Sequence, residues 1–321
     1  MHRATTKTGP KKKLLLAFDA FGTLFTPKTP IASQYGEVAR RYKVAEGVSD
    51  NEIKKSFGKA FKEESKEHPN YGKKVGMAAP EWWARLTPNN RLKVITKTFR
   101  PFLLAADASL PSGLVPDLLT RFSTSEGYAL YPDVLPFFSQ LRQLNSASPP
   151  PHQQHHQHHW RWDHTIVGII TNSDDRIPGI LSSFGLSVGP RRAGTADSST
   201  EDASANATEE EDISFVVLSY DVGASKPDRA IFDAAKQIGT ELFAKVDGAD
   251  GEGFEMLYVG DEVEKDVLAA EDAGWGALLV DREERFRERF TDGRQMVTVA
   301  EGEREFSVMN DLSALSSWRS R

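Results

Sequence analysis

Short apolar runs recur along the second half of the chain, and helical patterns separate them. The runs are uniformly apolar, which is typical of parallel strands covered on both faces. They lie in TIVGIITN (165–172), DISFVVLSY (212–220), FEMLYVGD (254–261) and GALLVDR (276–282), and a similar run, LLLAF (14–18), lies near the N-terminus. This alternation predicts an α/β fold with a doubly wound, Rossmann-like parallel sheet.

A stretch of about one hundred residues after the first strand has a different pattern. From Thr26 to Glu126 the apolar residues follow three-and-four spacing, as in IASQYGEVARRY and DNEIKKSFGKAFKEESKEH, which indicates helices throughout. Ser49 or Asp50 is a suitable cap for the second of these helices. We therefore predict a core made of residues 1–26 and 127–321, with a helical domain inserted at 27–126.

Two biased segments interrupt the predicted core. One, near 145–163, is rich in Pro, Gln and His, and the other, near 190–212, is acidic and made of small residues. Both are predicted to be surface loops that leave the α/β core unchanged. The histidine run is predicted to bind metals adventitiously, if at all.

Charge and composition exclude several classes of protein. The 321 residues carry a formal net charge of −6, which argues against a general nucleic-acid binder, and no apolar run is long enough to span a bilayer. The absence of cysteine excludes disulfides and thiolate chemistry and suits a reducing compartment. Lys11–Lys13 is interpreted as a solvated leader, with an import signal as the alternative. We expect a cytoplasmic or nuclear protein whose protein partners, if any, are unknown.

Polar residues with complementary chemistry follow four of the predicted strands. Asp19 ends the first strand, Thr171 ends the second, Lys226 follows the third, and Asp261 with Asp266 follows the fourth. In an open parallel sheet these positions meet in the crevice beyond the carboxyl ends of the strands. Each residue taken alone has an ordinary structural explanation as a cap, a turn or a solvated loop residue, but the ordered set points to a site.

The set fits a phosphoryl ester. A carboxylate such as Asp19 can attack phosphorus, and the hydroxyl of Thr171 and the ammonium of Lys226 can bind the phosphoryl oxygens. Without a cation the carboxylates would repel such a substrate, so Asp261 and Asp266 imply a Mg²⁺ ion.

The same residues resemble the motifs of the haloacid dehalogenase superfamily of hydrolases. FDAFGTLF, IITN, SKPDRAIFDAA and VGDEVEKD stand in the order of its four motifs and cover residues 12–30 and 130–282. The helical segment 27–126 then resembles the type-one cap domain of that superfamily. Within it, HPNYG, EWWARL, SKPDRAIF and GDEVEKD resemble the subgroup called haloacid dehalogenase-like hydrolase domain-containing protein three, with its fungal relatives.

The resemblance implies roles for individual residues. Asp19 matches the nucleophile, Thr171 and Lys226 match the phosphate-binding residues, and the metal site comprises Asp19, Asp261, Asp266 and the backbone carbonyl of Phe21. Asn172, Gly22 and Thr23 complete the predicted substrate-binding set. The implied activity is that of a Mg²⁺-dependent phosphatase that forms an aspartyl phosphate from a small phosphorylated metabolite.

Phe21 departs from the pattern, because most phosphatases of the superfamily carry a general-acid aspartate there. Loss of such a group costs about 10²–10⁴-fold in rate for a poor leaving group. Several interpretations remain open: a phosphatase for good leaving groups such as acyl phosphates, one that obtains its acid from the cap or the substrate, a binding protein without turnover, or a 2-haloacid dehalogenase, which carries an aromatic residue there.

The predicted cap contains further candidate residues. Its aromatic residues Tyr71, Trp82 and Trp83 stand at helical spacing, which favours a place in a core but allows one at the interface between cap and core. A second set consists of arginines that either lie in solvent or reach a phosphate: Arg40, Arg41 and Arg85.

Overall fold

We analysed a computed structural model of the chain. The structure describes residues 12–84, 93–103, 109–145, 160–194, 211–247, 251, 253–291, 295–301 and 304–319. Most of the two biased segments, the histidine run, Lys11 and Arg85 lie outside the described residues. No described helix combines the length and the apolar character needed to cross a membrane.

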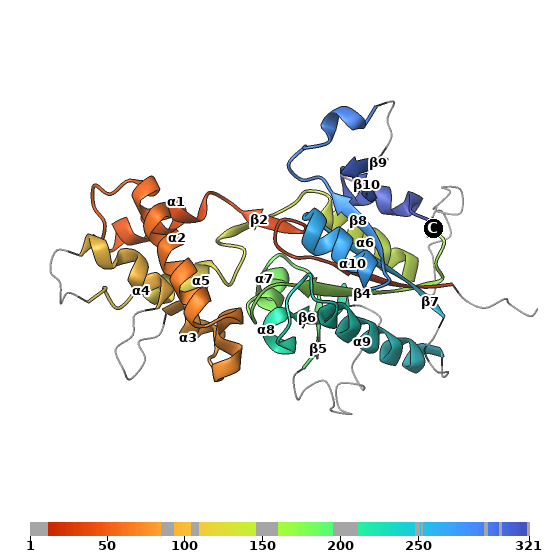
Figure 1. Ribbon diagram of the computed structural model, residues 1–321, viewed down its shortest axis with the longest axis horizontal. Helices are drawn as coiled ribbons and strands as arrows, with labels where there is room; N and C mark the ends of the chain where they lie inside the picture. Colours follow the sequence, from red (N-terminus) through yellow and green to blue (C-terminus); the bar gives the residue numbers. More distant parts are fainter. Residues whose placement is uncertain are drawn as a thin grey trace, which may run out of the picture.

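An eight-stranded sheet forms the centre of the molecule (Figure 1). Its strand order is β5-β6-β4-β1-β7-β8-β10-β9, and every neighbouring pair is parallel except β10 and β9. The strands are β1 (Lys13–Phe18), β4 (His164–Thr171), β5 (Val188–Arg192), β6 (Ile213–Leu218), β7 (Phe254–Gly260), β8 (Gly276–Val280), β9 (Met296–Glu301) and β10 (Arg304–Met309). The predicted doubly wound α/β fold is confirmed.

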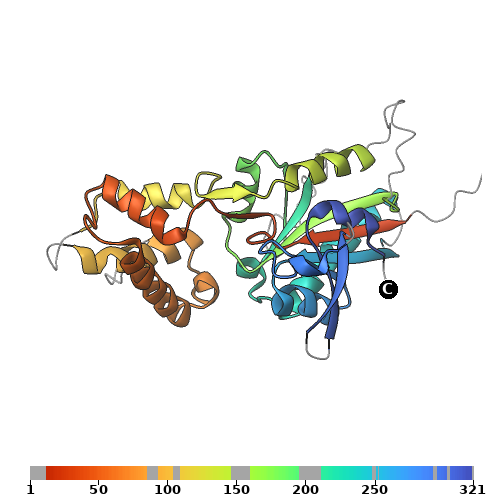
Figure 2. The ribbon, with the colours of Figure 1, turned by 90° about the horizontal axis from the view of Figure 1, so that it is seen from above.

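Helices cover both faces of this sheet (Figure 2). Leu14, Leu16 and Phe18 of β1 pack with one group of helices, whereas Leu15 and Ala17 pack with the other. The first group comprises α6 (Val134–Asn145), α7 (Ile177–Ser183) and η7 (Leu312–Ser317), and the second comprises α9 (Ala230–Asp247), η5 (Val263–Leu268) and α10 (Ala269–Asp272). Successive side chains of a strand point to opposite faces, so a strand between two helical layers must be apolar throughout.

The segment between the two short strands β2 (Phe25–Pro27) and β3 (Tyr128–Leu130), called the helical insert below, lies to one side of the sheet (Figure 1). Its elements are α1 (Ile31–Arg41), α2 (Asp50–Glu67), η1 (Asn70–Val75), α3 (Ala79–Ala84), α4 (Val94–Phe99), η2 (Arg100–Phe102) and α5 (Leu114–Arg121). The domain boundaries at 26/27 and 126/127 stay predictions.

A capping box starts the longest helix of the insert. The Ser49 hydroxyl accepts a hydrogen bond from the N–H of Glu52, and the Glu52 carboxylate accepts one from the N–H of Ser49. These two bonds satisfy N–H groups that the first turn leaves without partners. The predicted cap at Ser49 is therefore confirmed.

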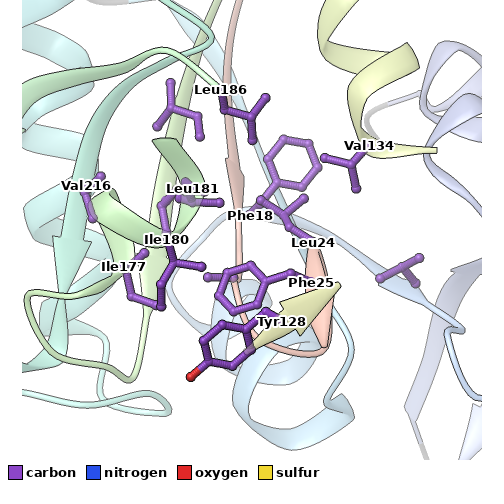
Figure 3. Packing of buried hydrophobic residues seen from close by; sticks show 14 of the residues in the cluster. Phe18, Leu24, Phe25, Tyr128, Val134, Ile177, Ile180, Leu181, Leu186 and Val216 are labelled. Atoms are coloured by element: carbon purple, nitrogen blue, oxygen red, sulfur yellow. The ribbon is translucent and has the colours of Figure 1, made fainter. Parts of the chain in front are cut away.

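A short ribbon at the junction of the helical insert with the core was not predicted. Phe25–Pro27 and Tyr128–Leu130 pair as an antiparallel ribbon at the junction with the core. The rings of Phe25 and Tyr128 lie 5.1 Å apart, next to Ile177 and Ile180 of α7 (Figure 3). This packing anchors the root of the insert to the core.

Three other parts of the core were not predicted. The C-terminal strands β9 and β10 mix buried, half-buried and exposed positions, unlike the uniformly apolar runs. Strand β5 overlaps the start of the segment near 190–212 that was predicted to be a loop. It contains Pro190, which is tolerated because β5 is an edge strand of the sheet. Trp162 of the other predicted loop is buried and stacks on Trp318, with ring centroids 5.6 Å apart.

Candidate active site

Asp19 lies directly beyond the central strand β1. Its backbone N–H donates a hydrogen bond of 2.8 Å to the carbonyl of Val259, so the β1–β7 pairing continues for one residue past the strand. The side chain is buried, and its Oδ1 lies 3.0 Å from Nζ of Lys226. The sheet therefore holds a carboxylate at its carboxyl edge, as predicted for a strand-end position.

Lys226 is the cation at the centre of the site. Its Nζ donates hydrogen bonds to Oδ1 of Asp266 at 2.6 Å and to the hydroxyl of Tyr258 at 2.8 Å. The side chain of Asn172 holds the backbone of Lys226, because its Oδ1 accepts from the Lys226 N–H at 2.7 Å and its Nδ2 donates to the Lys226 carbonyl at 2.9 Å. Asn172 therefore positions Lys226.

Three carboxylates converge around this lysine. Asp19, Asp261 and Asp266 each offer one oxygen, and the three oxygens lie within 4.8 Å of one another. We call these carboxylates together with Lys226 the carboxylate site. Such an oxygen-only donor set suits a hard cation such as Mg²⁺. Three negative charges against one positive charge also leave a formal excess of two, which a divalent cation would neutralise.

Small residues allow the carboxylates to approach the backbone. Gly22 has φ +84°, and a Cβ there would lie 2.4 Å from Oδ2 of Asp261. A Cβ on Gly260 would lie 2.2 Å from Cγ of Asp266. Any other residue at Gly22 would be strained in conformation and would also displace Asp261.

The electrostatics of the site reflect crowding of negative charge. Burial raises the pKa of Asp19, and Asp266 raises it further, against the lowering effects of Lys226 and a hydrogen bond from Thr171. Burial and the charges of Asp19 and Asp266 raise the pKa of Asp261 to about 6. Burial alone would lower the pKa of Lys226, but Asp19 and Asp266 outweigh it and raise this pKa, so the lysine stays protonated.

A cavity of about 360 Å³ opens above the carboxylate site, between the sheet edge and the helical insert. This volume is in the range of small-molecule sites. Asp19, Thr171 and Lys226 line its floor, and Tyr71 and Trp83 of the insert line its far wall. The elements that carry the predicted chemistry therefore face a space in which a small ligand would fit.

Polar contacts tie the insert to the core beside this cavity. Nε1 of Trp83 donates a hydrogen bond of 2.8 Å to Oδ2 of Asp174, which is fully buried after β4. Arg176 binds both oxygens of Asp174 at 2.8 Å, and its guanidinium lies 4.5 Å from the ring centroid of Trp83. These contacts hold the insert against the sheet edge.

Strained backbone places Tyr71 in the cavity wall. Asn70, Tyr71 and Gly72 are successive residues with φ of 47°, 55° and 77°. Two bonds to Ser219 hold Asn70: its Nδ2 donates to the Ser219 carbonyl at 2.6 Å, and its Oδ1 accepts from the Ser219 hydroxyl at 3.0 Å. Left-handed backbone at non-glycine residues persists only where the surroundings impose it, and it clusters at functional sites.

Most of the predicted site residues meet at this cavity. The structure brings together Asp19, Phe21, Thr171, Asn172 and Lys226 as lining residues, with Asp261 and Asp266 beside them. The roles assigned to these residues remain predictions.

Thr23 has a contact other than the one predicted. Its side chain is fully buried, and its hydroxyl donates a hydrogen bond of 3.0 Å to Oδ1 of Asp261. In this structure it orients a carboxylate instead of lining the cavity.

The candidates in the insert separate into two groups. Tyr71 and Trp83 line the cavity, whereas Trp82 is 1% exposed and packs inside the insert. Arg40 pairs with Asp50 at 3.2 Å, and Arg41 lies 3.5 Å from Asp117, so both arginines contact acidic residues of the insert itself.

Three residues at the site were not predicted from the sequence: Asp174 and Arg176, which line the cavity, and Tyr258, which contacts Lys226. The first two follow the β4 strand end in TNSDDR, so their place beyond the carboxyl edge was a usable signal. Tyr258 lies within the apolar run of β7, and its hydroxyl donates a hydrogen bond of 2.7 Å to the Ile170 carbonyl. Nothing in the sequence pattern of this strand indicated that the hydroxyl belongs to the site.

The chain is similar to known hydrolases over most of its length. The family model of haloacid dehalogenase-like hydrolases matches residues 14–274, and the chain belongs to this family.

Among individual relatives, the chain is 29% identical over 280 residues to an uncharacterized hydrolase of Schizosaccharomyces pombe, covering 87% of this chain and 96% of the relative. It is 24% identical over 266 residues to haloacid dehalogenase-like hydrolase domain-containing protein 3 of Xenopus laevis, covering 83% of each chain. The predicted resemblance to that subgroup and its fungal relatives is confirmed.

The chain also aligns with solved structures over most of its length. A crystal structure of a HAD phosphatase from Thermococcus onnurineus aligns with a TM-score of 0.47 and 18% identity, covering 94% of this chain and 96% of that one. A 2-haloacid dehalogenase from Pseudomonas syringae aligns with a TM-score of 0.49 and 19% identity, covering 95% and 97%.

Proposed function

We propose that this hydrolase is a Mg²⁺-dependent phosphatase that acts through an aspartyl phosphate on Asp19. The observation that carries the proposal is the carboxylate site: Asp19, Asp261 and Asp266 lie close together beside one lysine, which pairs with Asp19 and Asp266. Asp19 and this lysine line the floor of a ligand-sized cavity. Such an excess of negative charge is costly without a cation and is suited to a site that binds one together with an anionic substrate.

In the proposed reaction Asp19 attacks the phosphorus of the bound substrate. A bond forms between the Asp19 carboxylate and phosphorus, and the bond from phosphorus to the leaving oxygen breaks. Lys226 and Thr171, which line the same floor, bind phosphoryl oxygens as charge develops on them. Mg²⁺, held by Asp19, Asp261, Asp266 and the Phe21 carbonyl, would supply further neutralisation of that charge.

Water then attacks the aspartyl phosphate, releases inorganic phosphate and regenerates Asp19. Phe21 cannot protonate the leaving oxygen in the first step or deprotonate this water in the second. The proposal therefore favours substrates whose leaving group departs as a stable anion, because these do not need the general acid.

The helical insert acts as the cap in this proposal. Its residues Tyr71 and Trp83 form the wall opposite Asp19, and its bond to Asp174 lies at the rim. Closing this wall over the substrate would exclude bulk water and strengthen the electrostatic interactions in the site.

A 2-haloacid dehalogenase is the second candidate, favoured by Phe21. Displacement of halide from carbon by Asp19 requires no proton donor, so an aromatic residue at this position is compatible with it. The excess negative charge of the carboxylate site argues for the phosphatase, because a dehalogenase that uses no metal would leave this charge without a neutralising cation.

The test is hydrolysis of acetyl phosphate and p-nitrophenyl phosphate by the wild-type protein and by Asp19→Asn, with and without Mg²⁺. Magnesium-dependent turnover that is lost in Asp19→Asn supports the phosphatase. Halide release from 2-chloropropionate without Mg²⁺ would support the dehalogenase. Ligand binding without turnover of any of these compounds would indicate a binding protein.

A further inference from the structure

Aromatic rings line much of the cavity that Asp19 faces. Phe21, Phe61, Tyr71, Trp83 and Tyr128 all line it, and they come from five different elements or loops of the chain. Phe21 is 45% exposed, which is unusual for a phenylalanine beside a nucleophile. A group bound between Asp19 and the helical insert would therefore contact ring faces and edges.

The charged side chains of this wall already have protein partners. Asp174 is bound by Arg176 and Trp83, and Glu262 pairs with Lys265 at 2.7 Å. The wall thus consists of apolar surface and satisfied charges. A polyhydroxylated leaving group such as a sugar would bring hydroxyls that find few partners here, and leaving buried polar groups unsatisfied is costly.

The side chains of Asn172 and Ser173, which also line the cavity, are engaged as well. Asn172 makes two hydrogen bonds to the backbone of Lys226, and Ser173 makes a side-chain hydrogen bond with Tyr71. These two side chains therefore offer little hydrogen-bonding capacity to a leaving group, in contrast to the polar floor at Lys226.

Phe21 affects both the lining of the cavity and the choice of leaving group. It replaces a proton donor, and its ring is part of the apolar wall. An alkyl alcohol is a weak acid, with a pKa near that of water at about 15.7, and leaves poorly without protonation. A phenol, at about 10, or a carboxylic acid, at about 4, leaves as a far more stable anion.

We propose that the leaving group of the physiological substrate carries an aromatic ring, so that the substrate is an aryl phosphate or an aroyl phosphate. This inference rests on the proposed phosphatase activity. Asp19 forms its bond to phosphorus as the phosphorus–oxygen bond breaks, and the phenolate or aryl carboxylate departs with the electron pair. Water then releases inorganic phosphate, so one water is consumed for each phosphoryl group transferred.

The test compares benzoyl phosphate with acetyl phosphate. Both release a carboxylate, so they differ chiefly in the ring and not in leaving-group chemistry. We expect kcat/KM to be about tenfold or more higher for benzoyl phosphate, the effect of one well-packed aromatic contact. Phenyl phosphate is the third substrate, and its rate relative to benzoyl phosphate distinguishes phenols from aromatic acids as the source of the ring.

Variants of the aromatic lining residues test whether these rings cause the preference for benzoyl phosphate. In Trp83→Leu the preference for benzoyl over acetyl phosphate is expected to fall to about twofold or less, since the ring that faces the leaving group is gone. Phe61→Leu, on the exposed side of α2, is the second variant in case Trp83→Leu does not fold, and it should lower the same ratio. Phe102→Leu, an aromatic residue of the insert that does not line the cavity, should leave the ratio unchanged.

The outcomes separate this inference from the proposed function. Equal kcat/KM for the two acyl phosphates, with both dependent on Mg²⁺ and Asp19, would overturn the aromatic leaving group and leave the phosphatase standing. If neither is hydrolysed, the phosphatase fails, and the aromatic wall is tested by binding of phenylphosphonate against methylphosphonate to the Mg²⁺-loaded protein. Equal affinity of the two phosphonates would then overturn the inference as well.

Discussion

Two groups of buried charges in this molecule have similar contacts and opposite charge balance. In the carboxylate site Lys226 lies 2.6 Å from Asp266, and inside the helical insert Lys93 lies 2.6 Å from Glu64. Lys97 also binds Glu64, at 3.0 Å, and we call these three residues the insert ion cluster.

The difference between them is the number of carboxylates per lysine. In the insert ion cluster two lysines each bind one oxygen of a single carboxylate, so the negative charge of Glu64 is neutralised within the protein. In the carboxylate site three carboxylates lie close together, and one lysine pairs with two of them, Asp19 and Asp266. A buried carboxylate that lysines neutralise is a structural element, whereas a group of carboxylates that outnumbers its lysine needs a cation from outside to be neutralised.

The largest expected effect separates activity from stability at the carboxylate site. Asp19→Asn should lower kcat by about 10³-fold or more, because the nucleophile is lost. The free energy of unfolding of the metal-free protein should stay the same or rise, because one repelling charge is removed. Steady-state rates and chemical denaturation measure the two effects.

Asp233→Asn, at an exposed carboxylate of α9, is the matched control and should change neither quantity appreciably. A large loss of stability in Asp19→Asn would show that Asp19 is a structural partner of Lys226, and the contrast between the two clusters would disappear.

The reverse result is expected in the insert ion cluster. Glu64→Gln leaves Lys93, which is 1% exposed, without an anionic partner, and should lower the free energy of unfolding by about 3–5 kcal/mol. Denaturation in urea measures the change. Glu63→Gln, at an exposed position on the same helix, is the control and should shift the midpoint little.

The carboxylate site could be predicted from the sequence, whereas the insert ion cluster could not. Asp19, Thr171, Lys226 and Asp261 were found because parallel strands bring their carboxyl ends to one edge, which makes positions far apart in sequence into neighbours. Glu64 lies on α2 and Lys93 directly precedes α4, and the relative placement of these two helices depends on tertiary packing that no local pattern encodes.

Neighbouring aromatics show the same limit. Trp82 and Trp83 are adjacent in sequence, yet the first is buried within the insert and the second lines the cavity. Helical spacing could not separate them, because the left-handed turn at 70–72 and the bond to Asp174 set the orientation of α3. Strands β9 and β10 were missed because their mixed, partly exposed pattern lacks the continuous apolar run of the central strands.

A smaller effect is expected when the missing acid is restored. Phe21→Asp should raise kcat/KM for an alkyl phosphate such as glycerol phosphate by about 10²-fold, the lower range of general-acid assistance. The Phe21 side chain is 45% exposed, so a carboxylate there would remain partly hydrated. Phe21→Asn, which is similar in size but cannot donate a proton in this way, is the control. Equal rates in both variants would show that protonation of the leaving group is not what the site lacks.

The smallest effect concerns pH. Burial by itself would raise the pKa of Glu64, but hydrogen bonds from Lys93 and Lys97 outweigh burial and lower it. A carboxyl group whose pKa is lower in the folded state stabilises the fold above its unfolded pKa, and this contribution is lost as the pH falls through the folded value.

The destabilisation caused by Glu64→Gln should therefore be greatest near pH 7 and shrink as the pH falls below about 4. Thermal unfolding of the wild-type protein and of Glu64→Gln across this range measures the difference. A difference that stays constant with pH would mean that the charge of Glu64 does not carry its effect on stability.

The most direct test of the central claim is whether Asp19 itself receives the phosphoryl group. The wild-type protein would be mixed with acetyl phosphate and Mg²⁺, quenched in acid, reduced with borohydride and digested, and the peptide that contains Asp19 would be analysed by mass spectrometry. Conversion of residue 19 to homoserine, dependent on substrate and Mg²⁺, is the predicted result. Turnover of acetyl phosphate with residue 19 unmodified, or with the modification at another carboxylate, would contradict the account.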